Sequence, residues 1–172
     1  AASAFAAYKT ADYVRESAVL AARYETMGVT METLGRNAGY SAQQVNYVAS
    51  ALQKTGISML ESREQTARLI QANIDLAQAT DLARLAQDAA VVAGLNSSET
   101  FSRLVYGIQT GQVEILRNIG LNVDFEASYK SLAKELKKTT QQLSEHEKMQ
   151  ARVNVVMSKA GDVAGAYESA MM

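Results

Sequence analysis

No proline interrupts this chain of 172 residues, and side chains that begin helices recur along it at short intervals. In the pattern S-x-x-E/Q, the serine and the acidic or amide residue together bind two backbone N–H groups that the first helical turn leaves free. Three such pairs occur, at Ser41 and Gln44, Ser58 and Glu61, and Ser144 and Glu147. They predict three sharply defined helix starts, and Asp124 is a suitable N-cap for a fourth.

Glycines mark the matching helix ends. A glycine after the last apolar turn suits the left-handed C-cap, and an apolar residue following it packs back on the helix. Such glycines are Gly56, Gly94, Gly111 and Gly120. Leu121 is placed to contact Leu116 in this way. Gly107 differs because it lies inside a good helix, where it costs stability relative to alanine. We therefore expect another helix to approach its backbone closely, beside Tyr106.

The N-terminal third is expected to hold several separate helices. A helix up to Tyr24 carries a stripe of small residues, which permits a close neighbouring helix. The stripe consists of Ala7, Ala11, Val14, Ala18 and Ala21, with Phe5 and Tyr8 beside it. Gly28 is interpreted as its stop, followed by a short helix around Met31 and Leu34 that ends at Gly39.

Apolar spacing predicts further helices at 41–54, 96–111, 113–120, 124–136 and 144–158, with a break at 137–143. The longest helix is expected at 58–94, with a bend near Thr80. The tail at 161–172 has two glycines and weak periodicity, and is expected to fray. The division is therefore a helix at 1–27 that connects to the rest of a longer protein, a compact domain at 28–160 and the tail. The fold class is all-α, an irregular bundle or array of capped helices without a β-sheet.

Composition excludes several function classes. A net charge of −1 gives no basic footprint for nucleic acid, and charged residues interrupt every apolar stretch before it reaches the length of a membrane span. The absence of cysteine excludes disulfides, thiolate metal sites and cysteine nucleophiles. The first residues lack a signal-peptide pattern. They also lack an initiator Met, which suggests an excised piece, although removal of a tag would leave the same trace.

Catalytic and metal-binding groups are not evident. His146 is the only histidine, and it is interpreted as a solvent-side residue in the first turn of a capped helix, because catalytic metal sites need further imidazole or carboxylate ligands. The carboxylates are spread along helices at positions expected to face water, without a pair suited to acid–base catalysis. We therefore predict no catalytic, cofactor or metal site and no enzyme activity.

The central and C-terminal stretch resembles the tape measure proteins of bacteriophage and prophage tails over roughly residues 40–170. The run LAQDAAVVAGLNSSETFSRLVYGIQTGQVEILRNIGLNVDF contains a small-residue helix ending in glycine and then a G-x-x-x-[LI]-R-x-x-G-[LIV] pattern. Gly111, Leu116, Arg117, Gly120 and Leu121 carry that pattern, and Ser144 and Glu147 belong to the later segment LSEHEKMQARVNVVM. The family often has Leu-Gly before this second capping box, whereas here Lys137 follows Leu136.

The resemblance implies a structural function. Tape measure proteins are long, largely helical proteins that occupy the lumen of the assembling tail and set its length. The implied partners are the tail tube protein, tail assembly chaperones and tail-tip or baseplate proteins, with self-association in the tail. The implied location is the virion tail lumen, after assembly in the bacterial host cytoplasm. The dense helix punctuation favours a folded section of such a protein over the ruler itself.

Two other classes remain as alternatives. One is a soluble helical adaptor or host-interacting protein unrelated to phage. The other is an envelope-degrading hydrolase, which would need a pocket with two carboxylates and one perturbed pKa.

Overall fold

All regular structure in the described part of the chain is helical, which confirms the all-α prediction. The computed structural model describes the backbone of residues 2–172 and the side chains of residues 13–172. The α-helices are α1 (Ala2–Asn37), α2 (Ala42–Lys54), α3 (Met59–Gln71), α4 (Ala79–Ala93), α5 (Ser97–Thr110), α6 (Val113–Arg117), α7 (Phe125–Glu135), α8 (Glu145–Ser158) and α9 (Ala166–Met171). Short 3-10 turns are η1 (Leu76–Gln78), η2 (Thr140–Gln142) and η3 (Ala160–Asp162).

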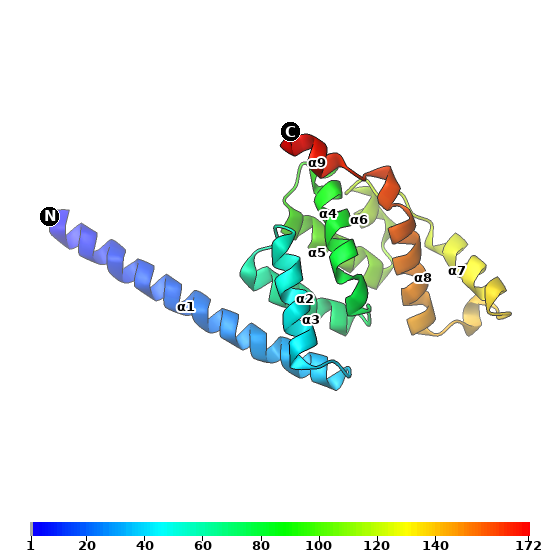
Figure 1. Ribbon diagram of the computed structural model, residues 1–172, viewed down its shortest axis with the longest axis horizontal. Coiled ribbons are helices and arrows are strands. Elements are labelled where there is room, and N and C mark those ends of the chain that lie inside the picture. The colour runs from blue at the N-terminus through cyan, green and yellow to red at the C-terminus, as the bar shows by residue number, and fades with distance from the viewer. Residues whose placement is uncertain (1) are drawn as a thin grey trace.

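The helices form a packed body from which the N-terminal part of α1 projects as a single rod (Figure 1). The C-terminal part of α1 packs against α2 and α3 at one side of the body. Helices α4 and α5 pack on each other at the centre, α7 and α8 form a neighbouring pair, and α9 covers α4. The outer layers therefore assemble around the α4–α5 pair.

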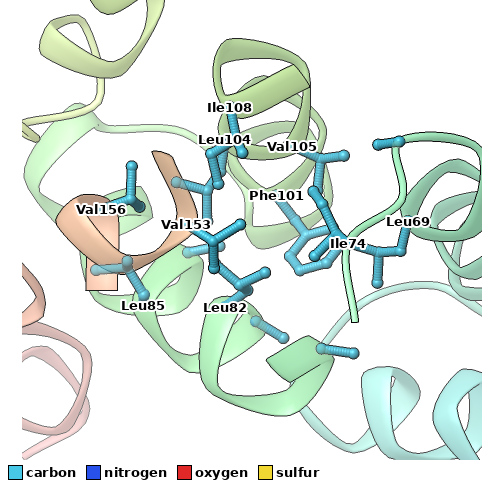
Figure 2. Packing of buried hydrophobic residues seen from close by; sticks show 14 of the residues in the cluster. Leu69, Ile74, Leu82, Leu85, Phe101, Leu104, Val105, Ile108, Val153 and Val156 are labelled. Atoms are coloured by element: carbon cyan, nitrogen blue, oxygen red, sulfur yellow. The ribbon is translucent and has the colours of Figure 1, made fainter. Parts of the chain in front are cut away.

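The core lies where α3, α4, α5 and α8 meet (Figure 2). Its largest member is Phe101, which is fully buried, and it is surrounded by aliphatic side chains from these four helices and from the connection that follows α3. The labelled neighbours are Leu69, Ile74, Leu82, Leu85, Leu104, Val105, Ile108, Val153 and Val156. The apolar face predicted for the helix at 96–111 is thus confirmed as the centre of the body.

Two of the three predicted capping boxes are complete. The Gln44 N–H donates to Ser41 Oγ at 3.2 Å, and the Ser41 N–H donates back to Gln44 Oε1 at 2.8 Å. Ser144 and Glu147 exchange the same two bonds, at 3.2 Å and 2.7 Å. The reciprocal pair therefore fixes the first residue of α2 and of α8, as the local sequence predicts.

The capping box at Ser58 is only half formed. Ser58 Oγ accepts from the Glu61 N–H at 3.3 Å, but the Ser58 N–H donates to Ser98 Oγ at 3.4 Å instead of to Glu61. The hydroxyl of Ser58 donates to the Glu61 carboxylate at 2.5 Å. The prediction of a reciprocal box here was wrong because the start of α5 supplies the second partner.

Gly28 does not end a helix, so the predicted stop and the predicted separate helix at 31–39 are wrong. Helix α1 continues through Gly28 to Asn37 and ends where Gly39 adopts a φ of +87°. Gly28 is buried, and a Cβ at this position would collide with the Arg63 guanidinium. The glycine therefore allows a close tertiary approach and does not act as a C-cap.

The predicted long helix at 58–94 is two helices, α3 and α4. Asn73 adopts a φ of +54°, and the Ile74 N–H donates to Leu69 O at 3.0 Å, which is the hydrogen bond of a helix C-cap. Asp75 then caps η1 by accepting from the Ala77 N–H at 3.0 Å. The bend expected near Thr80 is thus a full stop some residues earlier. It is made by asparagine, which tolerates the left-handed region better than most residues.

The C-terminal tail is ordered against the body, in contrast to the fraying that was expected. Val163 is buried, and the Tyr167 N–H donates to Asp88 Oδ1 of α4 at 2.9 Å. These contacts hold α9 over α4 (Figure 1). The break expected at 137–143 is confirmed, and Lys137 occupies the left-handed conformation there with a φ of +55°.

Candidate functional site

The glycine-rich stretch after α5 forms a buried corner in which α5, α6 and the connection to α7 meet. A Cβ placed on Gly107 would lie 2.7 Å from Leu116 Cδ2 and 2.8 Å from its Cγ. The close approach predicted at Gly107 is real, but it is made by a leucine side chain of α6 and not by another helix backbone. Leu116 and Leu121 are fully buried, and the Leu121 N–H donates to Leu116 O at 2.9 Å. The predicted contact between these two leucines is therefore part of a helix C-cap.

Other signature residues also have local structural roles. Gly111 and Gly120 take left-handed conformations, with φ of +72° and +84°. Asp124 accepts from the Ala127 N–H at 2.9 Å and begins α7. Arg117 is exposed and pairs with Glu114 at 2.9 Å.

The remaining signature residues lie elsewhere in the fold. Gly94 ends α4 with a φ of +67°, and Ser144 and Glu147 begin α8. The signature set is therefore distributed over several helix ends, and its buried part is the corner between α5 and α6.

Arg152 is the main residue that sequence reasoning missed. Its Nη1 donates to Ile108 O at 3.1 Å and Gln109 O at 2.8 Å, and its Nε donates to the Tyr129 hydroxyl. The guanidinium carbon lies 5.7 Å from the Tyr129 ring centroid and 6.0 Å from that of Phe125. One side chain of α8 thus holds the C-terminal end of α5 and the first turns of α7. The available signal was an arginine placed between two apolar positions of α8.

The titrating carboxyl groups that depart from ordinary values all favour the ionised form. Hydrogen bonds from Lys138 and from the Ser144 N–H lower the pKa of Glu147 to about 2. Hydrogen bonds from Ser58 and Ser98 lower the pKa of Glu61, and Lys148 lowers that of Glu145. A general acid needs a pKa raised toward neutrality, so none of these three groups is suited to that role.

His146 lies exposed in the first turn of α8, as predicted. Over the residues whose positions are described, no three His, Asp or Glu side chains are grouped to hold a metal ion. None of the described helices has the length and apolar character needed to cross a membrane.

The base of α1 is held to the body by specific contacts with α2 and α3. Arg63 of α3 donates to Tyr24 O at 2.7 Å, and its guanidinium carbon lies 3.5 Å above the Tyr24 ring centroid. A Cβ on Gly35 would lie 2.5 Å from Val45 Cγ1, so the helix backbone lies directly on the valine side chain. These contacts begin near residue 23, where Arg23 and Glu64 lie 3.9 Å apart. We call the part of α1 before them, residues 2–22, the arm.

The arm exposes apolar side chains that pack on nothing in this chain. Every described side chain from residue 13 to residue 22 is exposed. The large apolar ones are Tyr13, Val14, Val19 and Leu20, which are 72%, 60%, 54% and 55% exposed. The predicted stripe is therefore on the surface at Val14, Ala18 and Ala21, and its neighbouring helix is not found within the described chain. The other residues of that prediction, Phe5, Ala7, Tyr8 and Ala11, lie outside the described side chains.

This arm is the candidate interaction site. Single exposed apolar residues are ordinary, but a projecting helix turn after turn of which presents Ala, Val, Leu and Tyr is typical of a surface that binds protein. The low amphipathicity of α1 agrees with burial on more than one side. Comparisons of the chain with protein-family models, with curated proteins and with solved structures found no match.

Proposed function

We propose that this chain is a structural and assembly segment of a tail tape measure protein of a tailed bacteriophage or prophage. The observation that carries the proposal is the 36-residue helix α1, which runs without interruption from a densely packed helical body into an exposed apolar arm. A tape measure protein needs both parts: extended helix to fill a tube, and folded sections that contact other tail proteins. The order of motifs around the α5–α6 corner supports the same assignment.

In this proposal the arm lies along the axis of the tail, beside other copies of the protein or against the tail tube protein. Its apolar residues Val14, Val19 and Leu20 become buried there, each fully buried aliphatic side chain contributing about 1.5–3 kcal/mol. Before tube assembly, tail assembly chaperones would cover the same residues in the host cytoplasm. The body would contact tail-tip or baseplate proteins.

The experiment is to follow the segment in purified tails. An antibody raised against residues 28–160 is used on virions or induced prophage particles from the organism that encodes the chain. We expect it to detect the segment in intact tails and to lose the signal after DNA ejection. Absence from purified intact tails would overturn the proposal.

The contribution of the arm is tested separately. The double substitution Val14→Lys and Leu20→Lys places two charges on the arm and should prevent incorporation into tails. Val91→Lys is the matched control, because Val91 is an exposed valine of α4 in the body. If both variants are incorporated equally, the arm is not the assembly surface.

A second candidate function is a helical adaptor unrelated to phage. The exposed arm favours it too, since it would serve any partner with a complementary helix face. The outcomes differ: an adaptor would be recovered with one soluble partner and would be absent from purified tail particles.

A further inference from the structure

A hollow of about 400 Å³ lies on the surface of the body where α3, α5 and α6 meet. Arg68 comes from α3, while Ser102, Arg103 and Tyr106 come from α5. Ile115 of α6 and Asn118, which follows α6, complete the lining. The site is separate from the arm and from the capping residues discussed above.

The polar side chains of this hollow are rich in hydrogen-bond donors. Two guanidinium groups, two hydroxyls and one amide line it, and no carboxylate does. The nearest acid is Glu99, which accepts from Nη2 of Arg103 at 2.6 Å and leaves the other N–H groups of that guanidinium free for a ligand. Arg68 forms no ion pair with any described residue. The hollow therefore carries positive charge that the described part of the chain only partly neutralises.

A buried side chain sets the direction of one of these donors. Gln65 is only 3% exposed, and its amide Nε2 donates to Ser102 Oγ. Because the Ser102 oxygen accepts from Gln65, its own hydroxyl hydrogen remains available to a ligand in the hollow. The Gln65–Ser102 pair is thus a support behind the exposed arginines.

We propose that this hollow binds an oxyanion group, a carboxylate or a phosphate, with Arg68 and Arg103 supplying the charge and Ser102 a directed hydroxyl. Guanidinium groups suit both ligands because their planar N–H fork matches two oxygens of a carboxylate or phosphate. Tyr106 and Ile115 provide an apolar wall for the carbon atoms next to the charged group. This inference concerns the body alone and does not rest on the proposed tail function.

The test is an amide NMR titration of the ¹⁵N-labelled protein with sodium phosphate in one arm and sodium acetate in the other. Ionic strength is held constant with sodium chloride. We expect saturable shifts with millimolar affinity at the amides of Ser102, Arg103, Tyr106 and Asn118. The arm that saturates at lower concentration identifies the preferred source of the oxyanion.

Three variants make the test specific. Arg68→Gln and Arg103→Gln should each weaken binding by about tenfold, since a charge-assisted hydrogen bond is lost. Arg68→Lys should weaken it too, because lysine keeps the charge but not the fork. Arg84→Gln is the matched control, an exposed arginine of α4 that does not line the hollow, and it should bind like the wild type. Shifts that do not saturate with either anion, or that persist equally in the Arg68→Gln and Arg84→Gln variants, would overturn the proposal.

Discussion

Leu116 occupies the space that a side chain at Gly107 would need: its Cδ2 and Cγ would lie 2.7 Å and 2.8 Å from a Cβ built there. Both residues are buried, and Leu116 cannot move toward solvent without leaving the core. We therefore expect Gly107→Ala to destabilise the body by about 1–3 kcal/mol, although alanine is the better helix former by about 1 kcal/mol. Urea unfolding followed by circular dichroism measures the change.

Two controls separate crowding from other effects. Gly161→Ala places a Cβ in open space and should be neutral or slightly stabilising. The cost of Gly107→Ala should shrink in a Leu116→Ala background, where the space is free. An equal cost in both backgrounds would show that Leu116 is not the cause.

Lys137 sits in a left-handed conformation that glycine adopts without strain. Its φ is +55°, and the following Lys138 N–H donates to Ala133 O at 2.8 Å to close α7. We expect Lys137→Gly to stabilise the protein by about 0.5–1 kcal/mol, because the strain outweighs the entropy that glycine adds to the unfolded chain. The reverse change, Gly94→Ala, has open space around the Cβ but a φ of +67°, and should destabilise by about 1 kcal/mol. Thermal midpoints of both variants test the pair.

The start of α8 should weaken in acid. Glu147 has a folded-state pKa of about 2, below its ordinary value, because of Lys138 and the Ser144 N–H. A lowered folded-state pKa adds stability above the unfolded pKa, and this stability is lost as pH falls toward 2. We expect the melting temperature to fall over that range and the slope to be smaller in Glu147→Gln. Glutamine can keep the capping box, as Gln44 does in α2, so Gln44 shows that the variant should still fold.

Arg152 should be more important for stability than an ordinary surface arginine. Replacement by methionine leaves the carbonyls of Ile108 and Gln109 and the hydroxyl of Tyr129 without their charged donor. We expect a loss of about 1–3 kcal/mol in the free energy of unfolding. Arg103→Gln removes only an exposed pair with Glu99 and should cost less than about 1 kcal/mol. Similar losses in the two variants would contradict a clamping role for Arg152.

The arm should be dispensable for the stability of the body. Deletion of residues 1–22 removes only exposed side chains among those described, and the urea midpoint should stay within error of the full chain. Deletion of residues 1–37 also removes the fully buried Met31, whose loss alone is expected to cost about 2–5 kcal/mol. A large loss in the shorter deletion would mean that the arm packs on the body in solution.

Helix ends made by local chemistry were predictable from the sequence. The caps at Ser41, Ser144 and Asp124 depend on residues only three positions apart, so the pattern determines the geometry. The same holds for the left-handed glycines at Gly111 and Gly120. The apolar faces of the central helices followed from their periodicity for the same reason.

Features set by distant partners were not predictable in this way. Gly28 has the local context of a helix stop, and only the approach of Arg63 from α3 shows why the helix continues. Asn73 is a left-handed residue without a glycine, although the nearby Asp75 was a usable signal for a new helix start. The roles of Arg152 and Gln65 depend on residues more than 20 positions away in the sequence.

The way α1 is mounted makes it a lever. With a rise of about 1.5 Å per residue, the arm is roughly 33 Å long, so a tilt of about 10° at its base would move its tip by roughly 6 Å. The base rests on two glycine contacts, with the Arg63 guanidinium at Gly28 and the Val45 side chain at Gly35. A side-chain movement of ångström size at either contact is therefore magnified at the far end of the helix. A partner that repacks the base could thus report its binding to whatever holds the tip.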